Sequence, residues 1–150
     1  MKRALPLAEP SCGSCNVCCV EYGIDGVKRA GERCQHLVGG EHGCDRYDTR
    51  PRACAEYRCA YLTGAVRVRP DALGVVVRET APVGAIRVLH VEECVPGGLQ
   101  SWAWCKERSR LAGAMRGSEY VMWSRRGVVS SNATRVQWHV TGETLLAVMA

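Results

Sequence analysis

The chain has 150 residues, of which 47% are apolar and 23% are charged, and its formal net charge is +5. This composition is that of an ordinary globular domain, and a chain of this length can bury a core without needing disulfides. No stretch approaches the roughly 20 apolar residues of a membrane helix, so we expect no membrane partner. Thiolates bound to metal would offset the positive charge, which makes the basicity weak evidence for a nucleic-acid partner.

The first ten residues do not have the pattern of a secretory signal. Pro6 interrupts their apolar run and Glu9 ends it, whereas a signal peptide needs roughly 7–15 apolar residues there. We therefore expect a cytoplasmic protein in a reducing compartment. Disulfides are rare there, and dense cysteines more often bind metal or take part in catalysis.

Cysteines dominate the next segment, residues 12–63. Eight of the ten cysteines of the chain fall within it: Cys12, Cys15, Cys18, Cys19, Cys34, Cys44, Cys54 and Cys59. The segment lacks long apolar runs and cannot bury enough surface alone, so it needs cross-links or a neighbour to pack on. We predict that these eight cysteines are metal ligands, and that residues 12–63 form a metal-binding region packed as one unit with residues 64–150.

The spacing at the start of this segment limits how metal can be bound. Cys12, Cys15 and Cys18 repeat at steps of three, like the C-x2-C-x2-C run of bacterial ferredoxins, but Cys19 follows immediately. Adjacent side chains diverge by about 100° on a helix and about 180° on a strand. Cys18 and Cys19 are therefore predicted to serve two nearby centres or one polynuclear centre. One simple division gives each centre two cysteines from residues 12–19 and two from the other four. The spacing does not determine which cysteine belongs to which centre.

The remainder of the chain predicts a mixture of strands and one longer helix. Beta-branched runs at 73–78 and 85–91, separated by a Pro/Gly turn at 81–84, predict two strands. Residues 99–116 predict a helix. It has Leu99, Trp102, Cys105 and Ser109 on one stripe and Ala103, Leu111 and Met115 near another.

Further short strands are expected at 120–123, 128–129 and 135–140. A final helical turn is expected to begin at 141–144 and to run through Leu145, Leu146 and Met149. The fold class predicted from these elements is α+β, with a small metal-stabilised, cysteine-rich N-terminal lobe packed on a mixed strand and helix C-terminal half.

Ordered residues between the cysteines carry a family resemblance. Cys34-Gln35-His36-Leu37 is followed by a run from Cys44 to Cys54 that contains Tyr47, Arg50 and Pro51, and then by Tyr57-Arg58-Cys59. Over residues 12–62 the chain resembles the zinc- or iron-chelating cysteine-cluster family of CxxCxxCC type, called YkgJ-like, whose cluster also occurs in flagellin lysine methylases. Tyr57 stands where that family commonly has Phe. The resemblance implies a centre of zinc or iron, and the absence of a methyl-donor motif means that methyl transfer is not carried over.

Several residues near the cysteines have a structural and a functional interpretation. Arg50 could donate to thiolates and offset their charge, Pro51 fixes the chain before Cys54, and Tyr47 could shield the site from water, although each could also be ordinary loop packing. His36 is an alternative ligand to a cysteine. The remaining candidates are expected to be structural or solvated: His42, His90, His139, Cys94 and Cys105.

Four functions are consistent with these patterns. The first is a cytosolic metal-binding protein carrying zinc or an iron–sulfur centre, including a 4Fe–4S cluster. The second is a redox or cluster-dependent enzyme. The sequence contains no phosphate loop, nucleophile elbow or His/carboxylate motif that would favour an enzyme. A pocket lined by Trp102, Trp104 or arginines would support this function.

The third is a nucleic-acid-binding module, which mixes basic and aromatic residues as single-strand binders do. Its candidate residues are Arg46, Arg50, Arg52, Arg58, Tyr47 and Tyr57. The fourth is a redox switch whose thiols form disulfides.

Overall fold

The computed structural model describes residues 10–38, 43–141 and 144–149, and it contains both helices and strands. The α+β prediction is therefore confirmed. The elements, in chain order, are α1 (Cys18–Glu21), η1 (Tyr47–Thr49), α2 (Arg52–Glu56), α3 (Pro70–Leu73), β1 (Val75–Val83), β2 (Ile86–Glu93), η2 (Gly98–Gln100), α4 (Trp102–Ala114), β3 (Tyr120–Ser124), β4 (Gly127–Ser131), β5 (Val136–Thr141) and β6 (Thr144–Met149).

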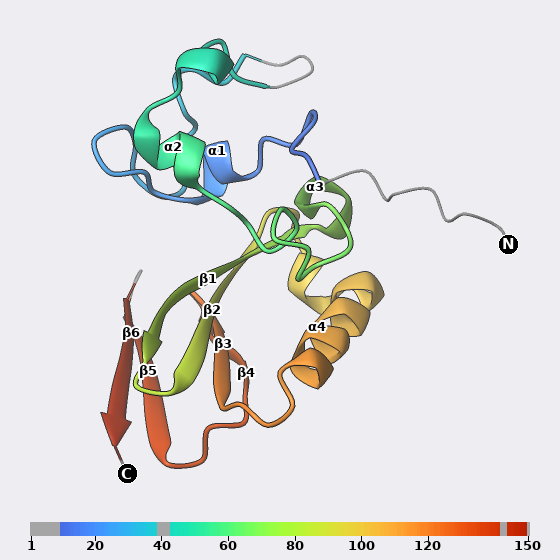
Figure 1. The fold of residues 1–150 in the computed structure, drawn as a ribbon, viewed down its shortest axis with the longest axis vertical. Helices are drawn as coiled ribbons and strands as arrows, with labels where there is room; N and C mark the ends of the chain where they lie inside the picture. Colours follow the sequence, from blue (N-terminus) through green and yellow to red (C-terminus); the bar gives the residue numbers. More distant parts are fainter. Residues whose placement is uncertain (1–9, 39–42, 142–143, 150) are drawn as a thin grey trace, which may run out of the picture.

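A four-stranded sheet with the order β1-β2-β3-β4 forms the centre of the described structure (Figure 1). β1 and β2 form the antiparallel pair expected from the two β-branched runs, and Gly84, with φ of +59°, lies in the turn between them. β2 and β3 are parallel. Parallel neighbours need a crossover of a dozen or more residues, and residues 94–119, which contain α4, supply it.

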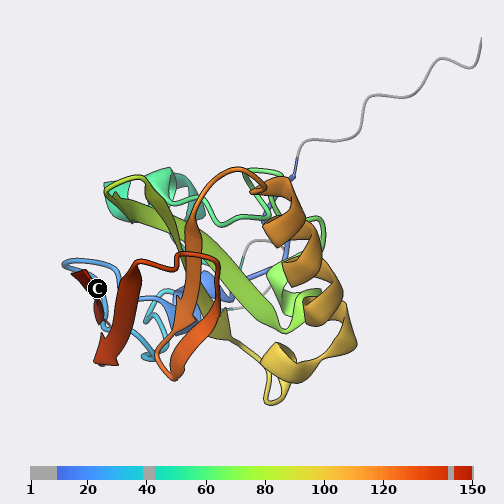
Figure 2. The same cartoon turned by 90° about the horizontal axis from the view of Figure 1, so that it is seen from below.

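Helix α4 covers one face of this sheet (Figure 2). Its buried side chains are Trp104, Glu107 and Leu111, and Trp104 packs in one core cluster with Leu89 and Met122. The helix was predicted correctly. Of its two expected stripes, the one with Leu111 and Met115 supplies buried residues, whereas Trp102 on the other is 77% exposed. Ser101 accepts a hydrogen bond from the backbone N–H of Trp104, which caps the helix and makes Trp102 its first residue.

The opposite face of the sheet is covered at one end by the two-stranded ribbon of β5 and β6 (Figure 2). Val88, Val121 and Trp123 from the sheet pack there against Val136 of β5. The strands expected at 120–123, 128–129 and 135–140 correspond to β3, β4 and β5, so those predictions are confirmed.

The predicted final helical turn is wrong, because Thr144–Met149 is strand β6, paired antiparallel with β5. Leu145 and Ala147 pack against the core shared with the sheet, whereas Leu146 and Val148 are exposed. This alternation is the period of two that a half-buried strand requires. Gly142 and Glu143 of the predicted turn lie outside the described residues.

The cysteine-bearing segment lies at the end of the sheet where β1 begins and β2 ends (Figure 1). Val17, Tyr22 and Cys59 pack with Val76 of β1 in a third core cluster. The N–H of Ala60 donates to the carbonyl of Val77 at 2.7 Å, which attaches the chain beside Cys59 to the sheet.

Candidate metal centre

A cavity in the cysteine-bearing segment is lined by seven of the eight predicted ligands. Its volume of about 70 Å³ is several times the 10–15 Å³ that one water molecule needs, so it has room for an ion. Tyr22, His36, Tyr47, Arg50 and Tyr57 also line it. The cysteines on its wall are Cys12, Cys15, Cys18, Cys19, Cys34, Cys44 and Cys54.

The eighth predicted ligand, Cys59, lies on a second, smaller hollow. Cys12, Cys15 and Cys18 line this hollow as well, so they separate it from the larger cavity. The structure thus gathers all eight cysteines around two adjoining spaces, although they are spread over 48 positions of the sequence.

Short local elements aim these side chains inward. The N–H of Cys15 bonds the carbonyl of Cys12 at 2.8 Å in a turn that uses a positive φ at Gly13. Cys18 and Cys19 open α1. Pro51 precedes α2, and its carbonyl accepts from the N–H of Cys54 at 2.9 Å.

The thiols are close neighbours but do not form a closed coordination shell. All ten cysteines belong to the described residues, and none forms a disulfide. Within residues 10–38, 43–141 and 144–149, no three Cys, His, Asp or Glu side chains lie at the spacing of ligands around one ion. The arrangement is therefore a set of soft donors around two hollows.

Burial and hydrogen bonding set the acidity of these thiols. A hydrogen bond from Cys18 lowers the pKa of Cys19 to about 7, and the positive charges of Lys28 and Arg50 act in the same direction. The same bond, followed by burial, raises the pKa of Cys18. Burial is the largest cause of the raised pKa of Cys12 and Cys15. A bound cation would remove this penalty, because thiolates are the form that ligates metal.

Arg50 is a cation whose charge acts on three of the thiols. Its guanidinium lies over the ring of Tyr47, 3.8 Å from the centroid, and its charge acts to lower the pKa of Cys12, Cys19 and Cys54. Its Nε is buried and has no hydrogen-bond partner within the described part of the chain. Arg50 is thus placed to offset negative charge in the cavity.

The histidines are placed less favourably for ligation. His36 lines the cavity, but its Nδ1 lies 3.0 Å from Oδ1 of Asp45. His139 is exposed on β5, and His42 lies outside the described residues. Of the residues whose presence in a pocket would support an enzyme, Trp102 and Trp104 do not line the cysteine cavity, whereas two arginines, Arg46 and Arg50, do.

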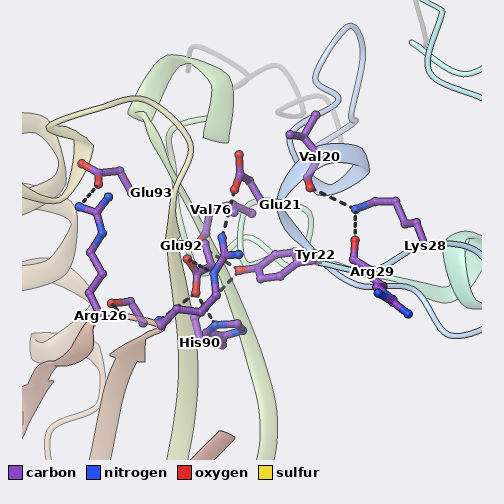
Figure 3. Close-up of polar contacts among 12 residues, drawn as sticks. Val20, Glu21, Tyr22, Lys28, Arg29, Val76, His90, Glu92, Glu93 and Arg126 are labelled. Atoms are coloured by element: carbon purple, nitrogen blue, oxygen red, sulfur yellow. Dashed lines mark hydrogen bonds and ion pairs between the residues drawn. The ribbon is translucent and has the colours of Figure 1, made fainter. Parts of the chain in front are cut away.

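A buried polar network connects the cysteine-bearing segment to the sheet (Figure 3). The hydroxyl of Tyr22 donates towards the carbonyls of Val76 and His90, at 3.2 and 3.3 Å. Nε2 of His90 lies 2.7 Å from Oε1 of Glu92, which also accepts from the N–H of Arg125 at 3.1 Å.

The same arginine links this network back to helix α1. Nε of Arg125 lies 3.1 Å from Oε2 of Glu92, and its terminal nitrogen lies 3.4 Å from Oε2 of Glu21. His90 was expected to be structural, and it does stack on Trp123 at 4.2 Å. The i, i+2 spacing of His90 and Glu92 on one strand face could have indicated their pairing, but no sequence signal indicates Arg125.

Cys94 also lies closer to the site than its sequence position suggests. It packs beside Cys15, Cys18 and Cys59 in the third core cluster, and its Sγ donates to the carbonyl of Pro70 at 3.4 Å. Cys105 lies on α4 and contributes to neither cysteine-lined hollow.

Comparison of the chain with models of protein families, with curated proteins and with solved structures finds no match. In the described part of the chain, no helix has both the length and the apolar character needed to cross a bilayer.

Proposed function

We propose that this chain is a metal-binding protein of the cytoplasm that holds zinc or iron on eight cysteines: Cys12, Cys15, Cys18, Cys19, Cys34, Cys44, Cys54 and Cys59. The observation that carries the proposal is the convergence of these eight thiols on two adjoining hollows without any disulfide. Soft thiolates select zinc or iron–sulfur clusters over harder cations such as magnesium.

The limited burial of the segment supports a folding role for the metal. Helices α1 and α2 and the turn η1 contain no fully buried residue, and of their residues only Cys18 packs against a core cluster. Metal binding in such a segment is coupled to its folding. The resemblance to the zinc- or iron-chelating family, over residues 12–62, supports the same reading.

Zinc and iron would supply different chemistry. Zinc held by four thiolates has no open position for water and would be structural. An iron–sulfur centre would add electron transfer or sensing. The eight cysteines and the nearby cations Arg50 and Lys28 suit either group, because both need deprotonated thiols.

The nucleic-acid alternative is less well supported by the aromatic residues. Tyr57 is directed at Tyr22, with ring centroids 5.8 Å apart, and Arg50 covers Tyr47. Arg52 pairs with Glu56 at 2.6 Å. Side chains engaged in this way are not presented as stacking platforms for bases.

The test is the metal content and visible spectrum of protein purified without oxygen. We expect zinc or iron at stoichiometric amounts, and an iron–sulfur centre would colour the protein. Cys105→Ser is a matched control that should retain all the metal, since Cys105 is remote from the hollows. A colourless protein with free thiols and neither zinc nor iron would refute the proposal.

A further inference from the structure

We infer that the eight cysteines form two unequal four-thiolate centres, an inner one that is structural and an outer one that exchanges its metal. The inner set is Cys12, Cys15, Cys18 and Cys59, and the outer set is Cys19, Cys34, Cys44 and Cys54. This inference rests on the proposed metal-binding function and goes further by assigning the ligands and the lability of each centre.

The division follows from which hollow each cysteine lines. The smaller hollow is lined by four cysteines, and these are the inner set. The other four line only the larger cavity. Each set has four thiols, the number of ligands that a tetrahedral zinc or iron site takes, and Cys12, Cys15 and Cys18 lie between the two spaces.

Backbone contacts hold the outer set together. The N–H of Cys34 donates to the carbonyl of Cys19 at 2.9 Å, which holds Cys34 beside α1. Leu37 then donates to the carbonyl of Cys34 and forms an antiparallel bridge with Cys44. These contacts join cysteines that are far apart in the sequence, without involving Cys12, Cys15 or Cys59.

The electrostatic neighbours of the thiols follow this division at Cys54 and cross it at Cys19. After burial, the main causes that raise the pKa of Cys54 are the charges of Cys19, Cys34 and Cys44, all in the outer set. The pKa of Cys12 is raised by burial, then by Cys59 of the inner set, and less by Cys19 of the outer set. The hydrogen bond between Cys18 and Cys19 makes these two thiols the main contact between the sets.

The two sets differ in what surrounds them. In the inner set, Cys59 belongs to the core cluster that contains Val17 and Val76, and Cys15 and Cys18 pack against that cluster. The next residue, Ala60, is hydrogen-bonded to β1. Opening the inner centre would therefore disturb the junction with the sheet.

The outer set is carried by elements with little packing of their own. Cys54 lies on α2, which has no buried residue. Cys34 is itself buried, but no outer cysteine belongs to any of the three core clusters. Segments with few buried apolar contacts open at low free-energy cost. The outer centre should therefore release and rebind metal while the remainder of the fold persists.

Zinc release from the zinc-loaded protein to a chromogenic chelator tests both the assignment of four cysteines to each centre and the difference in lability between the centres. We expect two zinc ions per chain, released in two phases whose rates differ by at least about tenfold, the scale on which surroundings alter metal affinity. Cys54→Ser should retain one ion and lose the fast phase. Cys12→Ser should lose the slow phase, and it is preferred to a Cys59 variant because Cys59 is buried. Cys105→Ser should show both phases unchanged.

Far-UV circular dichroism of each variant shows whether the sheet is still folded. One ion per chain, or a single cluster that Cys12→Ser and Cys54→Ser both abolish in folded protein, would overturn the division while leaving the proposed function intact. Release of two ions in one phase would overturn the difference in lability. Wild-type protein that binds neither zinc nor iron would overturn the proposed function itself.

Discussion

The carboxylate of Glu92 is the buried centre of the network that joins the cysteine-bearing segment to the sheet, and replacing it tests how far that junction contributes to stability. The side chains of Glu92 and His90 are only 6% and 5% exposed, and their closest atoms are 2.7 Å apart. Arg125 adds two contacts to the same carboxylate, each at 3.1 Å. The substitution Glu92→Gln removes the charge and keeps the shape.

The expected loss follows from the burial of the partners. Removing one member of a buried ion pair costs about 3–5 kcal/mol, because the other member stays desolvated. Arg125 is 32% exposed and can turn towards water, which places the expected loss near the lower end, at about 3 kcal/mol. At roughly 2–4 °C per kcal/mol for a chain of this size, the Tm should fall by about 6–12 °C.

Denaturant unfolding at fixed free zinc concentration measures this loss, since bound metal also shifts apparent stability. Glu79→Gln is the matched control. The carboxylate of Glu79 pairs with Arg87 at 2.7 Å but is 51% exposed, so its removal should cost at most about 1 kcal/mol. Equal losses for Glu92→Gln and Glu79→Gln would refute the reasoning.

The same prediction has a pH dependence. Burial acts to raise the pKa of Glu92, but hydrogen bonds from His90 and Arg125 prevail and lower the pKa below the ordinary 4.5. A carboxyl group with a depressed pKa in the folded state stabilises the fold above its unfolded pKa, and this contribution is lost as the pH falls through the folded pKa. The difference between wild type and Glu92→Gln should therefore narrow on acidification below about pH 4.5.

Three further predictions concern the core, the thiols and the metal. Met122→Ala should cost about 2–5 kcal/mol in denaturant unfolding, because Met122 is fully buried. The exposed control Val128→Ala should cost less than about 0.5 kcal/mol, and equal losses would contradict the packing. In reduced, metal-free protein, iodoacetamide read by tandem mass spectrometry should label Cys19 first and Cys18 and Cys94 last. The pKa of Cys19 is about 7, whereas the hydrogen bond to Cys19 and burial raise the pKa of Cys18, and burial raises that of Cys94 to about 12. Labelling of Cys19 should slow below pH 7, and a rate independent of pH would count against a thiolate there. Metal removal should speed hydrogen exchange at residues 12–59 but not at residues 86–93 and 120–124, whereas uniform acceleration would show that the sheet depends on the metal.

Local patterns predicted much of the C-terminal half. The hairpin of β1 and β2 follows from two β-branched runs and a Gly-containing turn, which act over a few residues. The division of Cys18 and Cys19 between two centres stays a prediction, and in the structure the two thiols are hydrogen-bonded to each other. The expected division of two and two is replaced in our proposal by three and one, since Cys12, Cys15 and Cys18, but not Cys19, line the smaller hollow with Cys59.

What the sequence predicted wrongly, or did not predict, depends on contacts between distant segments. The apolar run of β6 suits a strand or a helix, and its pairing with β5 decided the outcome. Trp102 and Trp104 have equal hydrophobicity, and only packing against Leu89 and Met122 buried Trp104. Arg125 meets Glu21 and Glu92 because the turn after β3 reaches α1, a contact between distant segments.

The sequence by itself determined the number of thiols, their crowding between positions 12 and 19, and most of the strands, because these depend on residue type and short-range spacing. Only the tertiary structure decided which thiols share a hollow and which of them pack against the core. Cys59 reaches Cys12 because Ala60 is attached to β1, whereas Cys54 remains on a helix without buried residues. Proximity between distant segments depends on packing and backbone pairing across the whole chain, and local spacing does not encode it.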